Sequence, residues 1–181
     1  MTASLDSFVR PAFAAAVTTA ATTPLALARH LARIPGLTHH LPLPGGERRW
    51  LKLPTDAGWD AWLIGWPPGS RTGWHDHRGS AGAFVLLAGE LTEWSVPATD
   101  RVSRVPGAEA VRASLNDMRV HAFGADAGRG FADHHIHDMA NLADRPAYSV
   151  HAYAPELRGM ASYEWTDGRL SRTGEKSSEA W

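Results

Sequence analysis

The chain has 181 residues, which is enough for one compact domain with its own core but short for two. Its 18 Lys and Arg residues nearly balance 19 Asp and Glu residues, so a net charge of -1 gives no electrostatic reason to bind nucleic acid or an anionic membrane. There is no cysteine, which excludes disulfides, cysteine-ligated zinc, iron–sulfur clusters and thiol nucleophiles, whereas 10 histidines provide abundant imidazole.

Residues 1–44 carry the strongest helix signal. The region is rich in alanine, and Thr22 and Thr23 stand before Pro24, a combination typical of a helix start. Leucines then recur at about the helical period as far as Ile34, and Gly36 is expected to end the helix. We therefore expect an N-terminal helical region over 1–44.

No export or membrane segment is expected at this end of the chain. Residues 12–26 are only faintly like an export signal, because threonines and Pro24 dilute the apolar part and Asp6 interrupts the basic start. The sequence also has no run of 18 apolar residues. These features predict a cytoplasmic protein without a membrane partner.

From Trp50 onward, short apolar runs alternate with turns rich in glycine and proline. Many short strands at this spacing predict an all-β sandwich or small barrel over 45–165 rather than a doubly wound sheet. The tail, 166–181, is polar and is expected to be frayed, so that 1–181 forms a single domain. The expected strands are 50–53, 61–66, 83–88, 90–96, 101–105, 118–123 and 148–154.

Two groups of histidines are candidates for metal binding. His75 and His77 are two residues apart, so on a strand their side chains share one face and can converge on one ion, while Asp76 between them points the other way. His135 and His137 repeat this spacing and offer a third imidazole, with the choice between them left open by the pattern. A surface pair beside a turn and a polar loop are the alternatives that do not involve a metal.

A third pattern lies in the last expected strand. Ser149, His151 and Tyr153 alternate with apolar residues and therefore share one face. Each can donate and accept a hydrogen bond, so they can form a relay that holds the Tyr153 hydroxyl beside a metal. The alternative is a half-buried polar strand. A serine-hydrolase triad is excluded, because the three side chains lie along one strand without a nucleophile elbow.

The histidine motifs resemble those of the cupin barrels. Gly69, His75 and His77, followed by Gly82 and Gly89, are similar to the first cupin motif, but alanine or glycine stands where that motif usually has its glutamate. His137 and Asn141 are similar to the second motif, although its upstream Pro-x-Gly is missing. The resemblance implies a jelly-roll β-barrel preceded by α-helices.

A cupin that keeps three histidines and lacks the glutamate resembles the thiol dioxygenases, in particular bacterial members of the cysteine dioxygenase (type I) family. Trp66-Pro67-Pro68-Gly69 and the Ser-x-His-x-Tyr strand fit this family, and the similarity extends over about 45–156. The resemblance implies that His75, His77 and His137 hold Fe(II) and that Ser149, His151 and Tyr153 are catalytic. It implies oxidation of a small thiol by dioxygen, L-cysteine to its sulfinate by default, in cysteine metabolism.

The same resemblance implies that an arginine binds the substrate carboxylate. The family arginine precedes the His-x-His pair by about 26 residues, which leads to Arg49, although a shift of one residue would select Arg48. The family tyrosine before this arginine is Glu47 here. Gly82 replaces the cysteine that some members crosslink to the relay tyrosine, so no thioether can form. These departures bear on the identity of the thiol more than on the chemistry.

Three neutral imidazoles leave the charge of a divalent ion uncompensated and coordination positions open, which favours an anionic ligand such as a thiolate. Iron fits because dioxygen needs a redox-active partner, whereas zinc in the same cage would polarise water. The alternatives are the same chemistry on another thiol such as 3-mercaptopropionate, a zinc or manganese cupin acting as isomerase or hydrolase, and a sensor or storage cupin. We expect a monomer whose only partners are the thiol and dioxygen.

Overall fold

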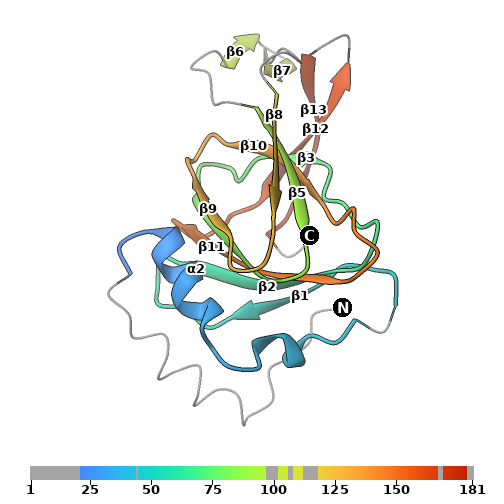
Figure 1. Cartoon of the computed structure of the whole chain (residues 1–181). Coiled ribbons are helices and arrows are strands. Elements are labelled where there is room, and N and C mark those ends of the chain that lie inside the picture. Colours follow the sequence, from blue (N-terminus) through green and yellow to red (C-terminus); the bar gives the residue numbers. More distant parts are fainter. Residues whose placement is uncertain are drawn as a thin grey trace.

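The computed structural model describes residues 21–43, 45–96, 102–105, 108–111, 118–166 and 169–178 (Figure 1). These residues form two antiparallel sheets, one with the strand order β1-β2-β11-β4-β9 and the other with the order β6-β7-β13-β12-β3-β10-β5-β8. The expected all-β architecture is therefore confirmed. The strands of the first sheet are β1 (Arg49–Leu53), β2 (Asp60–Trp66), β11 (Ala147–Ala154), β4 (Ala81–Ala88) and β9 (Gly128–Phe131). Those of the second are β6 (Val102–Val105), β7 (Ala108–Val111), β13 (Arg169–Lys176), β12 (Met160–Thr166), β3 (Trp74–His75), β10 (Ile136–Ala140), β5 (Leu91–Val96) and β8 (Arg119–Phe123).

The helix α2 (Pro24–Ala32) begins where the sequence predicts. The Thr23 side chain accepts a hydrogen bond from the Ala26 backbone N–H, and Pro24 occupies the first turn, where no N–H is needed. The helix ends at Ala32, four residues before Gly36, which instead adopts a left-handed conformation at the start of the 3-10 helix η1 (Leu37–His40). Residues 1–20 of the expected helical region lie outside the described residues.

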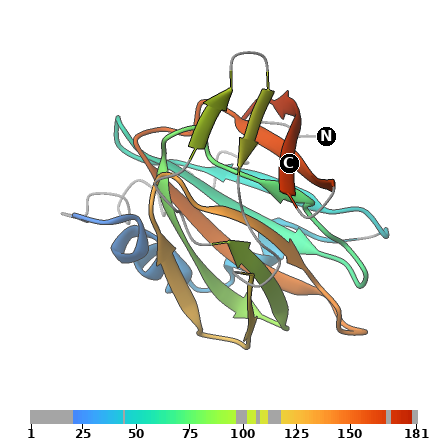
Figure 2. The ribbon, with the colours of Figure 1, turned by 90° about the horizontal axis from the view of Figure 1, so that it is seen from above.

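The five-stranded sheet has two different faces because side chains alternate along each strand. On its outer face, Leu51, Leu63, Val85 and Val150 pack in one apolar cluster with Leu27 of α2 and other apolar side chains. The view from above shows α2 lying outside the strands (Figure 2). The opposite face turns toward the interior between the sheets and carries a separate cluster that includes Trp62, Trp66, Phe84 and Tyr153.

The polar tail is the main difference from the expected fold. Over Arg169–Lys176 it forms β13, which pairs with β12 along its length, and Leu170 is fully buried in a small cluster with Tyr163. Leu170 is an isolated apolar residue in a polar sequence, so its alternation gave too weak a signal for a strand. The short strands β3, β7, β9, β10 and β12 were likewise not expected. None of the helices described here is both long enough and apolar enough to cross a membrane.

Candidate metal centre

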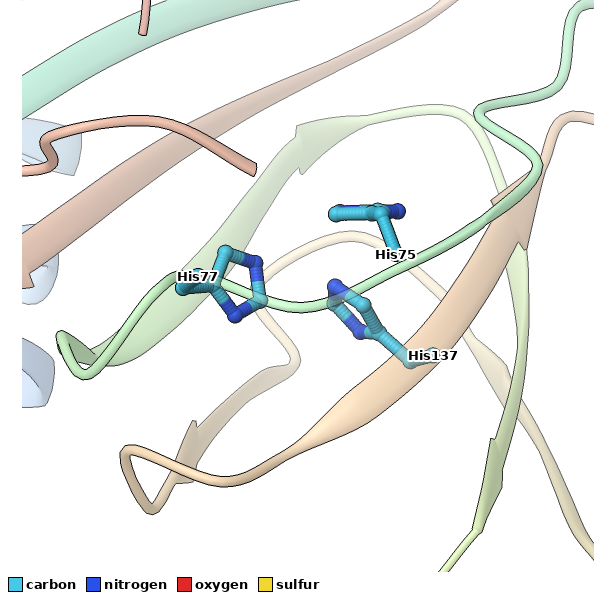
Figure 3. Close-up of side chains that lie close together, drawn as sticks. All are labelled: His75, His77 and His137. Atoms are coloured by element: carbon cyan, nitrogen blue, oxygen red, sulfur yellow. The ribbon is translucent and has the colours of Figure 1, made fainter. Parts of the chain in front are cut away.

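His75, His77 and His137 lie together in the interior (Figure 3). His75 in β3 is the direct cross-strand partner of His137 in β10, and His77 follows β3 before the next turn. The ring centroids are 4.6 Å apart for His75 and His137, 5.0 Å for His77 and His137, and 5.1 Å for His75 and His77. One nitrogen from each ring lies within 4.8 Å of those of the other two. The fold therefore brings together the three histidines that the family resemblance selected.

The ring nitrogens of this trio are only partly used by the protein. Nδ1 of His75 is 2.9 Å from the Gly73 carbonyl oxygen, which only accepts, so Nδ1 carries the proton and Nε2 keeps its lone pair. Among the described residues, neither ring nitrogen of the fully buried His77 has a hydrogen-bond partner. Burial first, and then neighbouring histidines including His137, hold the pKa values of His75 and His77 well below the ordinary range. Both rings are thus neutral at pH 7.

This donor set fits a divalent transition metal. A buried imidazole without a partner costs free energy, and a metal ion that accepts its lone pair removes that cost. Neutral imidazole is a good ligand for zinc, copper, iron and nickel, so the chemistry of the donors does not choose among them. No carboxylate belongs to the group formed by His75, His77 and His137.

A second buried cluster, centred on Glu93, adjoins the trio. Oε1 of Glu93 in β5 accepts hydrogen bonds from His137 Nδ1 at 2.7 Å and from His135 Nε2 at 2.9 Å, while Oε2 accepts one from Arg129 at 2.6 Å. Burial opposes ionisation of Glu93, but the hydrogen bonds from His135 and His137 outweigh it and hold the pKa of the carboxyl well below its usual range. Glu93 was not among the site residues predicted from the sequence. Its place between Leu91 and Ser95, which are buried on the same strand face, was the available signal.

The two candidates in the His134–His137 segment are separated by the structure. His137 joins His75 and His77, whereas His135 stacks on Phe131 and donates to Glu93. The side chain of His134 is 74% exposed. Asp76 points away from the trio, as expected from strand alternation, and accepts from the Ala161 backbone N–H and from the Tyr163 hydroxyl.

Ser149, His151 and Tyr153 form a line of hydrogen bonds along the inner face of β11. His151 Nε2 is 2.9 Å from Ser149 Oγ, and the Tyr153 hydroxyl is 3.4 Å from His151 Nδ1. The line extends one residue further than the sequence suggested, because the Trp66 indole N–H donates to Ser149 Oγ at 2.8 Å. The Tyr153 ring lies 5.1 Å from that of His77. This polar line therefore ends beside the trio.

The relay groups stay uncharged at neutral pH. Burial, followed by the fields of His137 and Arg48, lowers the pKa of His151 to about 3. Burial, followed by the field of Asp60, raises the pKa of Tyr153 well above 10. Tyr153 is thus a neutral phenol that keeps its proton for donation inside the barrel.

The two adjacent arginines point in opposite directions. Arg49 shares its strand face with Leu51 and Leu53, which pack against the α2 layer, and its guanidinium donates to the Pro42 carbonyl oxygen at 2.8 Å. Arg48 is turned the other way, with its guanidinium 5.2 Å from the centroid of the Trp66 ring. Its buried Nη1 has no partner among the described residues, and its field lowers the pKa values of His75 and His151. The structure thus brings Arg48, and not the expected Arg49, to the site.

Gly82 leaves room for an aromatic wall beside the trio. A Cβ at this position would clash with the Phe131 ring and would lie 2.8 Å from the Tyr153 ring. Phe131 fills this space and stacks on His77 with centroids 4.8 Å apart. The glycine is therefore required for the close packing of Phe131 and Tyr153.

Comparison with known proteins supports both the fold and the family. The family model described as cysteine dioxygenase type I matches residues 45–166. A search of curated proteins found no match.

Solved structures of low sequence identity share the fold. An uncharacterized conserved protein with a double-stranded beta-helix domain from Klebsiella pneumoniae subsp. pneumoniae matches 78% of this chain and 98% of its own, with TM-score 0.52 and 15% identity. The protein TT1209 from Thermus thermophilus matches 66% of this chain and 93% of its own, with TM-score 0.50 and 14% identity. An oxalate oxidase has TM-score 0.50 and 15% identity, and the match spans 66% of this chain but only 56% of the oxidase. The likeness confirms a cupin fold and carries no information on activity.

Proposed function

We propose that this chain, which belongs to the cysteine dioxygenase type I family, oxidises a small thiol that carries a carboxylate, with L-cysteine as the first candidate and Fe(II) as the metal. Membership makes the chain an enzyme of the metal-dependent oxidoreductase kind. In the proposed reaction both atoms of dioxygen are transferred to sulfur, R–SH + O2 → R–SO2H. The thiol sulfur is oxidised and dioxygen is reduced, so no further reductant is needed.

The observation that carries this proposal is the buried trio of imidazoles without a carboxylate among them, in which the pKa values of His75 and His77 lie well below the ordinary range. His75, His77 and His137 would hold the metal, and Fe(II) bound there would supply a redox-active partner for dioxygen and a site for the thiolate. Because the ligands are uncharged, an anionic substrate sulfur is favoured beside the dication. In support of this arrangement, His77 has two buried nitrogens without a partner among the described residues.

We assign the substrate carboxylate to Arg48 rather than to Arg49. A guanidinium presents parallel N–H donors that match the two oxygens of a carboxylate. Arg48 supports this role because its Nη1 is buried and unpartnered among the described residues and its charge is felt at both His75 and His151. Arg48 would thus fix one end of the substrate while the thiol lies at the trio.

Tyr153 would hold a proton near the reacting sulfur and oxygen atoms. Its phenol stays protonated, and His151, Ser149 and Trp66 restrict the position of the hydroxyl through successive hydrogen bonds. A donor that is already oriented needs little reorganisation during the reaction. The aromatic side chains Phe131 and Trp66 would keep bulk water from this end of the site.

The test is an aerobic assay of Fe(II)-loaded protein with L-cysteine, 3-mercaptopropionate and larger thiol acids, and with cysteamine as a thiol that lacks the carboxylate. We expect oxygen uptake and sulfinate formation in a ratio of one to one with at least one thiol acid, and little turnover of cysteamine. The protein loaded with Zn(II) serves as the control and should consume no oxygen. Absence of oxygen uptake with every thiol would contradict the proposal.

A further inference from the structure

Glu93 is a fully buried carboxylate on which three N–H donors converge. Arg129 from β9 reaches Oε2, and His135 and His137 both reach Oε1, each within 2.9 Å. Such charge-assisted bonds from several strands fix the carboxylate in one orientation. Glu93 is therefore a rigid acceptor directly behind His137.

The carboxylate decides which nitrogen of His137 carries the proton. An ionised carboxylate only accepts hydrogen bonds, so at 2.7 Å the Nδ1 of His137 must be the donor. With the Nδ1 proton directed at Glu93, Nε2 is the nitrogen of His137 that can present a lone pair to a metal. The Gly73 carbonyl oxygen fixes the tautomer of His75 in the same way, because it accepts a hydrogen bond from Nδ1. Two members of the trio are thus held in the tautomer that leaves Nε2 open.

The cluster of Glu93, His135 and His137 also has the spacing of a second metal site. Its bonding argues against that use. Both Glu93 oxygens are already occupied, and the Arg129 guanidinium lies 2.6 Å from one of them, where it would repel a dication. His135 offers its Nε2 proton, and not a lone pair, to the same carboxylate. The cluster is better described as support for His137.

We propose that Glu93 is a positioning residue that commits His137 to the Nδ1–H tautomer and so keeps its Nε2 open for a divalent cation. Arg129 pairs with the other oxygen, Oε2, while His135 shares Oε1 with His137. The inference rests on the metal role of the trio in the proposed function, but it concerns the ring proton of His137 and does not depend on the substrate. Partners of this kind typically change metal affinity by about 10- to 100-fold.

The variant that tests this role is Glu93→Gln, which keeps the size of the side chain. An amide has one oxygen, so it cannot accept from Arg129 on one side and from both histidines on the other. When its oxygen faces Arg129, its NH2 group faces His137 and selects the opposite tautomer. We expect Co(II), followed by its visible absorption under a competing chelator, to bind at least about 10-fold more weakly to Glu93→Gln than to the wild type.

The matched control is Arg129→Met in the same network. It removes the ion pair with Glu93 but leaves Oε1 free to accept from His137. We expect its Co(II) affinity to stay within about threefold of the wild type, even if the free energy of unfolding falls. A purely structural role of the network would instead weaken Co(II) binding equally in both variants, and that result would overturn the proposal.

A second measurement needs no metal, and its result for the wild type already tests the proposal. Long-range 1H–15N correlation spectra of the metal-free protein, labelled at histidine nitrogen, report which ring nitrogen of His137 carries the proton. We expect Nδ1 in the wild type and in Arg129→Met, and a population with the proton on Nε2 in Glu93→Gln. A wild-type His137 protonated on Nε2 would overturn the proposal even if Glu93→Gln does not fold. If the tautomers are as expected and Co(II) binds but no thiol is oxidised, the proposed function is refuted while the role of Glu93 stands.

Discussion

The two faces of the five-stranded sheet differ in whether their side chains carry polar groups. The outer face, under α2, is closed by aliphatic side chains such as Leu63, Val85 and Val150, which are almost fully buried. The inner face carries Trp66, Ser149, His151 and Tyr153. It faces the ring nitrogens of His77 and Nη1 of Arg48, which have no hydrogen-bond partner among the described residues. The same strands thus stabilise the fold on one face and line the candidate site on the other.

Because the faces alternate residue by residue, neighbouring substitutions on one strand separate stability from chemistry. A change on the outer face should lower the free energy of unfolding and leave the site intact. A change on the inner face, or in the histidines that it faces, should alter metal or substrate binding with a smaller effect on folding.

The largest effect is expected from His77→Ala. His77 has no hydrogen-bond partner among the described residues, so its removal breaks no observed hydrogen bond but deletes one of the three nitrogens proposed to bind the metal. Retention of iron after desalting, measured by metal analysis, should fall to background. His134→Ala, which changes an exposed side chain, is the control and should retain iron like the wild type. Normal iron content in His77→Ala would remove it from the centre.

Next in size is the effect of Arg48→Met compared with Arg49→Met. Loss of the buried guanidinium should raise the KM for a thiol acid by about 100-fold, which corresponds to about 2.7 kcal/mol. Arg49→Met removes only an outward hydrogen bond to Pro42 and should leave KM within about twofold. Steady-state oxygen uptake measures both values. A larger rise in KM for Arg49→Met than for Arg48→Met would assign the substrate carboxylate to Arg49.

Tyr153→Phe and Val150→Ala compare the two faces of β11. Loss of the phenol hydroxyl should lower kcat by roughly 100-fold, as expected for one oriented donor, with little change in unfolding. Val150→Ala should cost about 2 kcal/mol of unfolding free energy through lost burial, with kcat unchanged. Urea unfolding and oxygen uptake give the two quantities. Equal losses of kcat in both variants would mean that the faces are not independent.

The smallest effect is expected from Gly82→Ala, compared with Gly130→Ala. The new Cβ at position 82 would clash with the Phe131 and Tyr153 rings, and overpacking of this kind costs about 1–3 kcal/mol. At Gly130 the nearest atoms to a new Cβ are 3.7 and 3.9 Å away, which is ordinary contact. Thermal unfolding should therefore shift downward for Gly82→Ala only. An unchanged melting temperature for Gly82→Ala would show that Phe131 can move aside.

Much of the architecture could be predicted from local pattern. The N-cap at Thr23, the strands with clear apolar alternation and the shared face of Ser149, His151 and Tyr153 follow from side-chain periodicity, and the structure contains each of them. Strand β13 could not be predicted in this way, because its burial depends on pairing with β12 and on a single leucine. The direction of Arg49 was predictable in principle, since Leu51 and Leu53 share its face and define the apolar side of β1.

The sequence by itself determined the chemical types available to this protein: imidazoles in pairs, no thiol, no acid at the usual cupin position, and a polar line on one strand. Only the tertiary structure decided which of them meet. The pairing of β3 with β10 sets His75 opposite His137, and β5 brings Glu93 to His137 across 44 residues of sequence. These contacts depend on strand register between distant segments, which is set by the packing of the whole barrel and leaves no local trace in the chain.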